Sequence, residues 1–314
     1  MNPVYYIIIL LTLISYKITD MKILTPDLLT RSEVQINILS GQADYPYQYR
    51  VLKPLLGYTL QKVINNFVRG SLRSHLYAFQ IITLIAFFLF YFCFYKFLSM
   101  FFSDNSCIIG LMLLQVVIPL SITSIWQEGD FYNFIFFTIG FLLMFKSKDY
   151  YLPLVFGIGM LNREQIIFLM VFYIAFLLSQ NKLNSKKSYI VICLSVLACA
   201  IVYFALRWKY GFKSTEFNYN ASRNIENIWN IIQLWSAEVL IFVMLSLKTF
   251  KSSNKFFKLG LIALGLYFIL YFFYGYMGEL AKFLPAYLIL IPMSLQVLTR
   301  EPARNETEIF SHIS

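Results

Sequence analysis

Acidic and basic residues recur together in four polar segments of an otherwise apolar chain. The longest of these segments, 20–75, contains Asp27, Glu33, Asp44 and Arg50. The other three read Trp126-Gln127-Glu128-Gly129-Asp130, Asn162-Arg163-Glu164 and Gly278-Glu279-Leu280-Ala281-Lys282. Ionisable groups beside hydrocarbon are costly and tend to have a function. We therefore predict that these residues, distant along the chain, form one site.

This combination of side chains suits transfer of a sugar from a lipid-linked phosphate. The acceptor hydroxyl needs a carboxylate base within hydrogen-bond reach, and the leaving polyprenyl phosphate or diphosphate needs cations to hold its charge. The predicted catalytic acids are Asp27 and Glu33. The predicted substrate and phosphate contacts are Asp44, Tyr47, Arg50, Glu128, Asp130, Arg163, Glu164, Glu279 and Lys282. A divalent cation is a candidate cofactor, but no ligand set for it is predicted.

Each of these residues also has a purely structural interpretation. Asp27 follows Thr25-Pro26 and can cap a helix, whereas Glu33 and Asp44 suit a solvated loop. Arg50 suits an interfacial anchor among aromatic residues. Neighbouring opposite charges can neutralise each other, as in Arg163-Glu164 or the i, i+3 pair Glu279 and Lys282. Glu128 and Asp130 suit a hydrophilic turn. The site hypothesis therefore depends on the set and not on any one member.

The composition predicts that helices position these residues in a membrane. The chain has 314 residues, of which 59% are hydrophobic and 13% charged, against roughly 25% charged in soluble domains. Apolar runs of helical length recur from end to end, which is typical of transmembrane helices. We predict an all-α, polytopic membrane protein with a single transmembrane domain over residues 1–314.

Net charge and cysteine usage exclude several other classes. The net charge is +10, but lysines in cytoplasmic loops account for such an excess in a membrane protein, so no nucleic-acid partner is predicted. The four cysteines form no CxxC pair, and His75 and His312 stand alone in the sequence. These patterns predict neither a disulfide frame nor a histidine-based metal site.

Loop charge predicts the topology. The run 3–18 lacks a basic region and a cleavage site, so it is predicted to be a retained first helix. We predict about ten spans, at 3–19, 76–102, 107–126, 131–145, 150–161, 164–179, 188–206, 234–247, 257–275 and 280–298. This count places four basic clusters on one side, at 146–148, 182–187, 248–258 and 300–304. The positive-inside rule makes that side the cytoplasm. Both termini, including a short tail at 299–314, are then cytoplasmic, in a bacterial inner membrane.

Two segments and one loop test this topology. A single helix over 150–180 would separate the basic clusters that flank it, whereas a break at 162–164 keeps them together. Segment 51–68 is predicted to be an interfacial amphipathic helix and not a span. The first loop, 20–75, would be extracytoplasmic and yet is basic. Either its length weakens the rule, or its charges meet an anion such as a lipid headgroup or a phosphate-bearing substrate; both explanations stay open.

Several motifs resemble those of a known family. Asp27, a helix-like stretch to Ser40-Gly41, Tyr45-Pro46-Tyr47 and Tyr49-Arg50-Val51-Leu52-Lys53-Pro54 together resemble the first outer loop of GT-C-type membrane glycosyltransferases, among them the mannosyltransferases of glycolipid-anchor synthesis. Asn162-Arg163-Glu164 and Glu279-Leu280-Ala281-Lys282-Phe283-Leu284-Pro285 resemble bacterial relatives from polysaccharide and glycolipid gene clusters. The resemblance covers the first 60 residues best.

The resemblance implies a catalytic acid in the first outer loop and a polyprenyl-phosphate sugar donor. The nearest match to that acid is Asp27, followed by Glu33. The paired acids frequent in the family do not surround Asp27, whose neighbours are Thr25, Pro26 and Leu28, so metal dependence is not assigned.

We therefore expect a membrane glycosyltransferase that moves a sugar to a glycan or lipid-linked acceptor on the extracytoplasmic face. Its expected partners are the lipid-linked donor, the acceptor and membrane lipids. A polysaccharide repeat-unit polymerase needs similar residues and is one alternative. A transporter or lipid flippase, favoured by broken helices, and an assembly protein without activity are the others.

Overall fold

Every regular element in the computed structural model, which describes residues 3–212 and 220–304, is a helix. The α-helices are α1 (Pro3–Thr19), α2 (Leu28–Ser40), α3 (Leu52–Ile64), α4 (Ser71–Leu98), α5 (Asp104–Ser121), α6 (Glu128–Phe145), α7 (Leu152–Asn162), α8 (Leu169–Ser179), α9 (Lys186–Tyr210), α10 (Ala221–Glu226), α11 (Ile228–Ala237), α12 (Val239–Thr249), α13 (Lys255–Tyr274) and α14 (Tyr287–Leu298). Short 3-10 or π segments are η1 (Asp20–Leu24), η2 (Tyr47–Tyr49), η3 (Ile125–Gln127), η4 (Asp149–Tyr151), η5 (Glu164–Phe168) and η6 (Leu280–Ala286). The all-α prediction is confirmed for this part of the chain.

Six helical stretches among these residues are long and apolar enough to cross a membrane. They are Ser71–Leu98, Asp104–Ser121, Ile125–Phe145, Lys186–Tyr210, Lys255–Tyr274 and Leu280–Leu298. A seventh is a pair of helices, Ile228–Ser236 and Val239–Thr249, bent by 64° at the break between them. This supports a multi-pass membrane protein. Length and composition do not confirm the predicted count of about ten, because α1, α7 and α8 have only 17, 11 and 11 residues.

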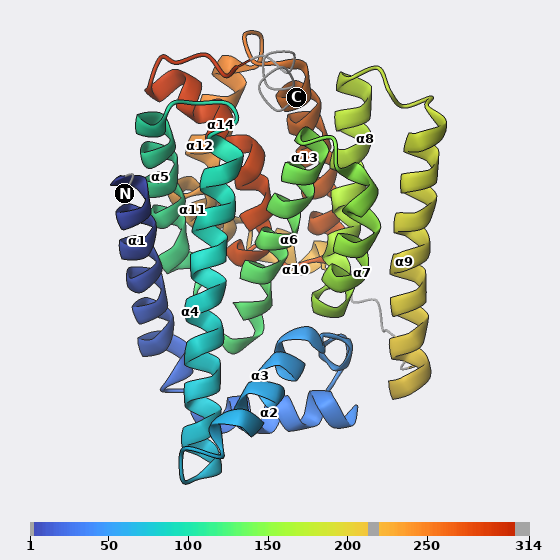
Figure 1. Cartoon of the computed structure of the whole chain (residues 1–314). Coiled ribbons are helices and arrows are strands. Elements are labelled where there is room, and N and C mark those ends of the chain that lie inside the picture. The colour runs from blue at the N-terminus through green and yellow to red at the C-terminus, as the bar shows by residue number, and fades with distance from the viewer. Residues whose placement is uncertain (1–2, 213–219, 305–314) are drawn as a thin grey trace.

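Most helices run side by side in one bundle, whose two ends differ (Figure 1). One end of the bundle holds the loops between α6 and α7, between α8 and α9, and between α12 and α13, which carry the basic clusters. Lys187 pairs with Asp149 at 2.6 Å, and Lys255 donates to Asn181 at 3.0 Å. The Ser103 hydroxyl donates to Glu301 at 2.8 Å, which places the C-terminal segment at the same end. Residues 305–314 of the predicted tail lie outside the described residues.

The opposite end of the bundle is covered by α2 and α3, the two helices of segment 20–75 (Figure 1). Helix α2 ends at Gly41, which adopts the left-handed φ of 76° that favours glycine. A Cβ at Gly41 would lie 2.6 Å from Tyr210 Cδ1, so the end of α2 packs directly on the end of α9. Helix α3 packs against α4. Segment 20–75 is therefore a helical layer and not an open loop.

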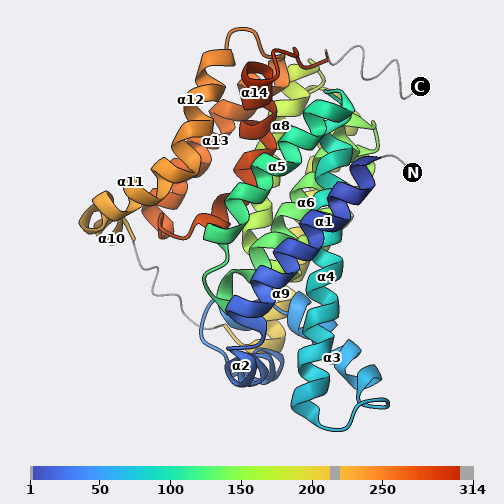
Figure 2. The same ribbon diagram turned by 90° about the vertical axis from the view of Figure 1, so that its left-hand side faces the viewer.

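Phenylalanine side chains and one central helix form the core of the bundle. The ring of Phe101, in the turn between α4 and α5, packs against the rings of Phe145 in α6 and Phe257 in α13. The centroids are 5.0 Å apart in each of these two pairs. Residues 287–295 of α14 are all buried. Figure 2 shows α10, α11 and α12 along one flank, away from α3. This packing fixes the start of α6 and the end of α7 at the end covered by α2 and α3.

The arrangement predicts the outcome of cysteine-accessibility labelling. In a background with the four native cysteines replaced, Lys148→Cys and Asn184→Cys should react with a membrane-impermeant maleimide from one side, and Asp44→Cys from the other. The reason is that α7 and α8 return the chain to the same end of the bundle. All three native residues are exposed. Labelling of positions 148 and 184 from opposite sides would contradict the arrangement.

Candidate functional site

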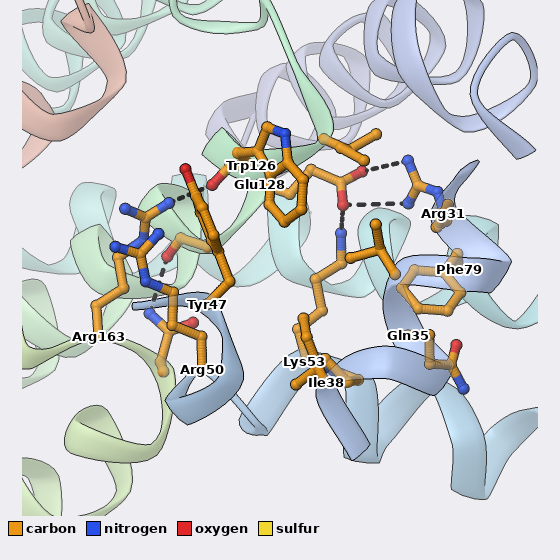
Figure 3. Close-up of a pocket in the computed structure, with 15 residues that line it drawn as sticks. Arg31, Gln35, Ile38, Tyr47, Arg50, Lys53, Phe79, Trp126, Glu128 and Arg163 are labelled. Atoms are coloured by element: carbon orange, nitrogen blue, oxygen red, sulfur yellow. Dashed lines mark hydrogen bonds and ion pairs between the residues drawn. The ribbon is translucent and has the colours of Figure 1, made fainter. Parts of the chain in front are cut away.

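A cavity lies where α2 and α3 meet the ends of α4, α6 and α7 (Figure 3). Its volume is about 70 Å³, several times the ~10–15 Å³ that one water needs. The residues that line it are Arg31, Val34, Gln35, Ile38, Tyr47, Arg50, Lys53, Pro54, Phe79, Ile125, Trp126, Glu128, Gly129, Asn162 and Arg163. Four of these side chains are cations, and only Glu128 is an acid.

Glu128 joins three helices through two buried cations. One carboxylate oxygen lies 2.7 Å from an Arg31 nitrogen, and the other accepts from Arg31 at 3.1 Å and from the Lys53 ammonium. Arg31, Lys53 and Glu128 are only 4%, 8% and 6% exposed. Glu128 is the first residue of α6, where the helix dipole favours negative charge. The contacts therefore attach α2 and α3 to the start of α6.

A second buried ion pair lies across the cavity. Arg163 Nη2 is 3.1 Å from Asp130 Oδ2, and the same guanidinium donates to the carbonyl of Trp126. Asn162 donates to the Gly129 carbonyl at 2.8 Å. A Cβ at Gly129 would lie 2.9 Å from Arg163 Nε, so a larger residue there would displace the Arg163 side chain. The helix break after α7 thus holds Arg163 against the start of α6.

Arg50 is the cation of the cavity without a carboxylate within ion-pair distance among the described residues. Its guanidinium lies 4.8 Å from the centre of the Tyr47 ring. Burial, and then the charge of Arg163, lower the pKa of Arg50 to about 10. Burial also lowers the pKa of Arg31 to about 10. For Lys53, burial and then the charge of Arg31 lower the pKa well below its ordinary range.

The charges that line the cavity are unequal in number. The four cations Arg31, Arg50, Lys53 and Arg163 face two carboxylates, Glu128 in the lining and Asp130 behind Arg163. Desolvated cations without matching negative charge are costly. An anionic ligand would supply that charge.

An aromatic pair lies between the cations. The rings of Tyr47 and Trp126 have centroids 4.0 Å apart at an angle of 39°, and Figure 3 shows them between Arg50 and Arg163 on one side and the Glu128 cluster on the other. Trp126 is 37% exposed. The two rings offer an apolar, partly open face between the charged side chains.

An apolar groove of about 620 Å³ lies next to the cavity along the same helices. On α4 the lining passes from Phe79 in the cavity to Ile82 in the groove; on α6 and α7 it passes from Glu128 to Tyr132 and from Asn162 to Ile158. Each step is three or four residues, which is one helical turn on one face. The remaining residues of the groove are Leu52, Leu56, Thr59, Leu60, Val63, Ile85, Ala86, Leu89, Ile135, Phe136 and Ile139.

The groove opens on the outer surface of the bundle. Leu56, Ile85 and Leu89 are 41%, 53% and 40% exposed, although all three are apolar. In a membrane such a surface faces lipid chains. The cavity and the groove therefore form one amphipathic site, charged at one end and apolar along the rest.

The structure brings some of the predicted residues together. Tyr47, Arg50, Glu128 and Arg163 line the cavity, and Asp130 lies directly behind Arg163. Glu279 and Lys282 pair at 2.5 Å and lie within electrostatic reach of Asp130. These residues come from four separate segments between residues 47 and 282, as the prediction of one converging site required.

The remaining predicted residues lie outside the cavity lining. Glu164 pairs with Arg207 of α9 at 2.8 Å. Glu33 and Asp44 are exposed. Asp27 is half-buried, one turn before Arg31, and acts electrostatically on it. The catalytic roles of Asp27 and Glu33 stay predictions.

The sequence interpretation missed Arg31 and Lys53 as site residues. A signal for them was present in the excess of basic residues in segment 20–75, which the positive-inside rule does not explain. The structure supplies an anion for these two cations, and it is the protein's own Glu128. Within the described residues, no group of three or more His, Cys, Asp or Glu residues could hold a metal ion.

Neutralising Glu128 should destabilise the protein. Glu128→Gln leaves Arg31 and Lys53 buried without a counter-charge, at a cost of about 3–5 kcal/mol. Chemical unfolding in mixed micelles measures this loss. The matched control is Glu33→Gln, an identical change at an exposed position, which should stay within about 0.5 kcal/mol of wild type. Equal stability of Glu128→Gln and wild type would show that the ion pairs do not hold α2 and α3.

Anion binding should weaken as pH rises through the lowered pKa of Lys53. The charged ammonium binds an anion and the neutral amine does not, so affinity is full below that pKa and falls above it. A phosphate monoester gains its second negative charge near pH 6, and Arg31 and Arg50, with pKa values of about 10, keep their charge up to about pH 9. Titration with dodecyl phosphate should show the fall in wild type, and Lys53→Met should abolish it. A fall of the same size in Lys53→Met would assign it to another group.

No protein-family model matches the chain, and comparisons with curated proteins and with solved structures found no match either. The comparisons therefore assign no family and add no residue roles. The function has to be argued from the charge, shape and position of the site itself.

Proposed function

We propose that the protein is a membrane glycosyltransferase. It moves a sugar from a polyprenyl-phosphate-type donor to a glycan or lipid-linked acceptor on the extracytoplasmic face of a bacterial inner membrane. The observation that carries this proposal is that a cation-rich cavity and an apolar groove lie one helical turn apart on the same helices. A ligand with a phosphate head and an isoprenoid tail matches both halves.

The cations bind the phosphate in this proposal. Arg50 has no carboxylate partner among the described residues, and the neighbouring Arg163 is paired with the carboxylate of Asp130. As the bond to the sugar breaks, negative charge grows on the departing phosphate. Fixed guanidinium groups in a water-poor site stabilise such charge most in the transition state.

The apolar parts of the site bind the rest of the donor. The isoprenoid tail lies along the groove, where aliphatic side chains and membrane lipid surround it. The sugar lies against the rings of Tyr47 and Trp126, which form the open apolar face between the cations. The phosphate is thereby held at the boundary between hydrocarbon and water.

Asp27 is the proposed general base. It carries no ion pair among the described residues and lies one turn before Arg31. Glu128 is a poorer candidate, because two cations bind its carboxylate and stabilise its ionised form. Neither Asp27 nor Glu33 lines the cavity, but Glu33, the second predicted acid, is exposed, whereas Asp27 is half-buried.

The proposed topology has about ten spans: α1, α7 and α8 are short spans, and they add to the six longer ones and to the bent pair α11 and α12, which counts as one span. The end of the bundle whose loops carry the basic clusters is then cytoplasmic. The site, with α2 and α3, faces outward, where lipid-linked sugars are used in the extracytoplasmic assembly of glycans. Both termini are cytoplasmic in this topology.

Two other functions need the same ligand. A repeat-unit polymerase would transfer a whole oligosaccharide from the lipid phosphate. A lipid flippase is favoured by the 64° break between α11 and α12, where Glu238 is 1% exposed and accepts only a 3.5 Å hydrogen bond from Tyr287. Product analysis separates the three: one added sugar, an added repeat unit, or moved but unchanged lipid.

Replacement of Asp27 should abolish transfer. In proteoliposomes supplied with sugar-charged undecaprenyl phosphates and an acceptor extract, Asp27→Asn should lower turnover by roughly 10²- to 10⁴-fold, the usual loss of a general base. Glu33→Gln serves as the control at an exposed acid of the same helix and should keep its activity. Wild-type turnover in the Asp27→Asn/Glu33→Gln double variant would contradict the proposal of a first-loop base.

A further inference from the structure

The four cations of the cavity form two separate pairs. Arg31 and Lys53 share the carboxylate of Glu128. Arg163 binds Asp130, and Arg50 lies near enough to Arg163 for that charge to act on it. Figure 3 shows the two pairs on opposite sides of Tyr47 and Trp126. All four side chains nevertheless line one cavity, so a single ligand can reach both pairs.

Each pair has one positive charge more than its carboxylate neutralises. Asp27 acts on Arg31 from outside the lining and does not touch either pair. A sugar phosphodiester carries one negative charge, whereas a sugar diphosphate diester carries two. A single phosphoryl group would therefore leave one buried pair with an uncompensated cation, which is costly. Burial is the main cause of the lowered pKa values of Arg50 and Lys53, and a neighbouring cation, Arg163 or Arg31, lowers each of them further.

We propose that the lipid-linked ligand carries a diphosphate, with one phosphoryl group bound at each cation pair. This inference rests on the proposed function and specifies its donor class. In the transfer, the acceptor oxygen forms a bond to the anomeric carbon, and the bond from that carbon to the diphosphate oxygen breaks. The bonding electrons leave with the polyprenyl diphosphate, and the acceptor proton passes to Asp27. The four cations together hold the charge that the leaving group gains.

The test compares two probes that have the same tail and differ by one phosphoryl group and the negative charge that it adds. Farnesyl phosphate and farnesyl diphosphate are titrated into the purified full-length protein in detergent, with farnesol as the probe of the tail alone. Wild type should bind the diphosphate roughly 10- to 100-fold more tightly, the gain expected from further hydrogen bonds between charged groups. Arg50→Gln and Lys53→Met each remove one pair's excess charge, and each should reduce this preference to about twofold or less.

The control variant is Lys62→Gln, which removes one exposed positive charge from the same helix as Lys53. It should keep the full preference for the diphosphate. Lys53→Met leaves the Arg31–Glu128 pair intact, and melting temperatures of both cavity variants show whether they fold.

Three results would overturn the inference. Equal affinity of wild type for both phosphates, each tighter than farnesol, would show a site for one phosphoryl group and leave the proposed function standing. A diphosphate preference that survives in both cavity variants would show general attraction instead of two subsites. If neither phosphate binds more tightly than farnesol, the proposed function fails together with the diphosphate.

Discussion

The buried carboxylate of Glu128 is the contact on which the site depends. It neutralises part of the charge of Arg31 and Lys53, and it joins α2, α3 and α6 at a place where water is scarce. Without a counter-charge, neither cation could stay buried beside hydrocarbon. The contact therefore holds the helical layer of segment 20–75 over the end of the bundle, and the cavity exists because that layer is held there.

The same electrostatics limit what the cavity can bind. Its carboxylates leave a positive excess, and its aromatic pair and neighbouring groove are apolar. A free sugar would not use the cations, and a simple phosphate would not use the groove. A lipid-borne phosphate uses both. Sugar transfer is the reaction that we propose for such a ligand next to the half-buried carboxylate of Asp27.

The sequence predicted the class of fold well, because long apolar runs have few alternatives to helices in a membrane. It also predicted that Arg50, Glu128 and Arg163 converge, since ionisable residues beside apolar runs are costly without partners. It did not predict how charges pair. Arg31 and Lys53 meet Glu128 about 97 and 75 positions away, and no local pattern records such a contact. The lengths of α7 and α8, 11 residues each, do not confirm that these helices cross the membrane. How far their side chains are buried depends on the helices packed against them.

An experimental structure of the protein in lipid nanodiscs with added undecaprenyl phosphate tests the central claim most directly. The account predicts density for a phosphate against Arg50 and Arg163, and density for the isoprenoid tail along the groove formed by α3, α4, α6 and α7. It would be contradicted if the lipid bound elsewhere while the cavity stayed closed by its own ion pairs.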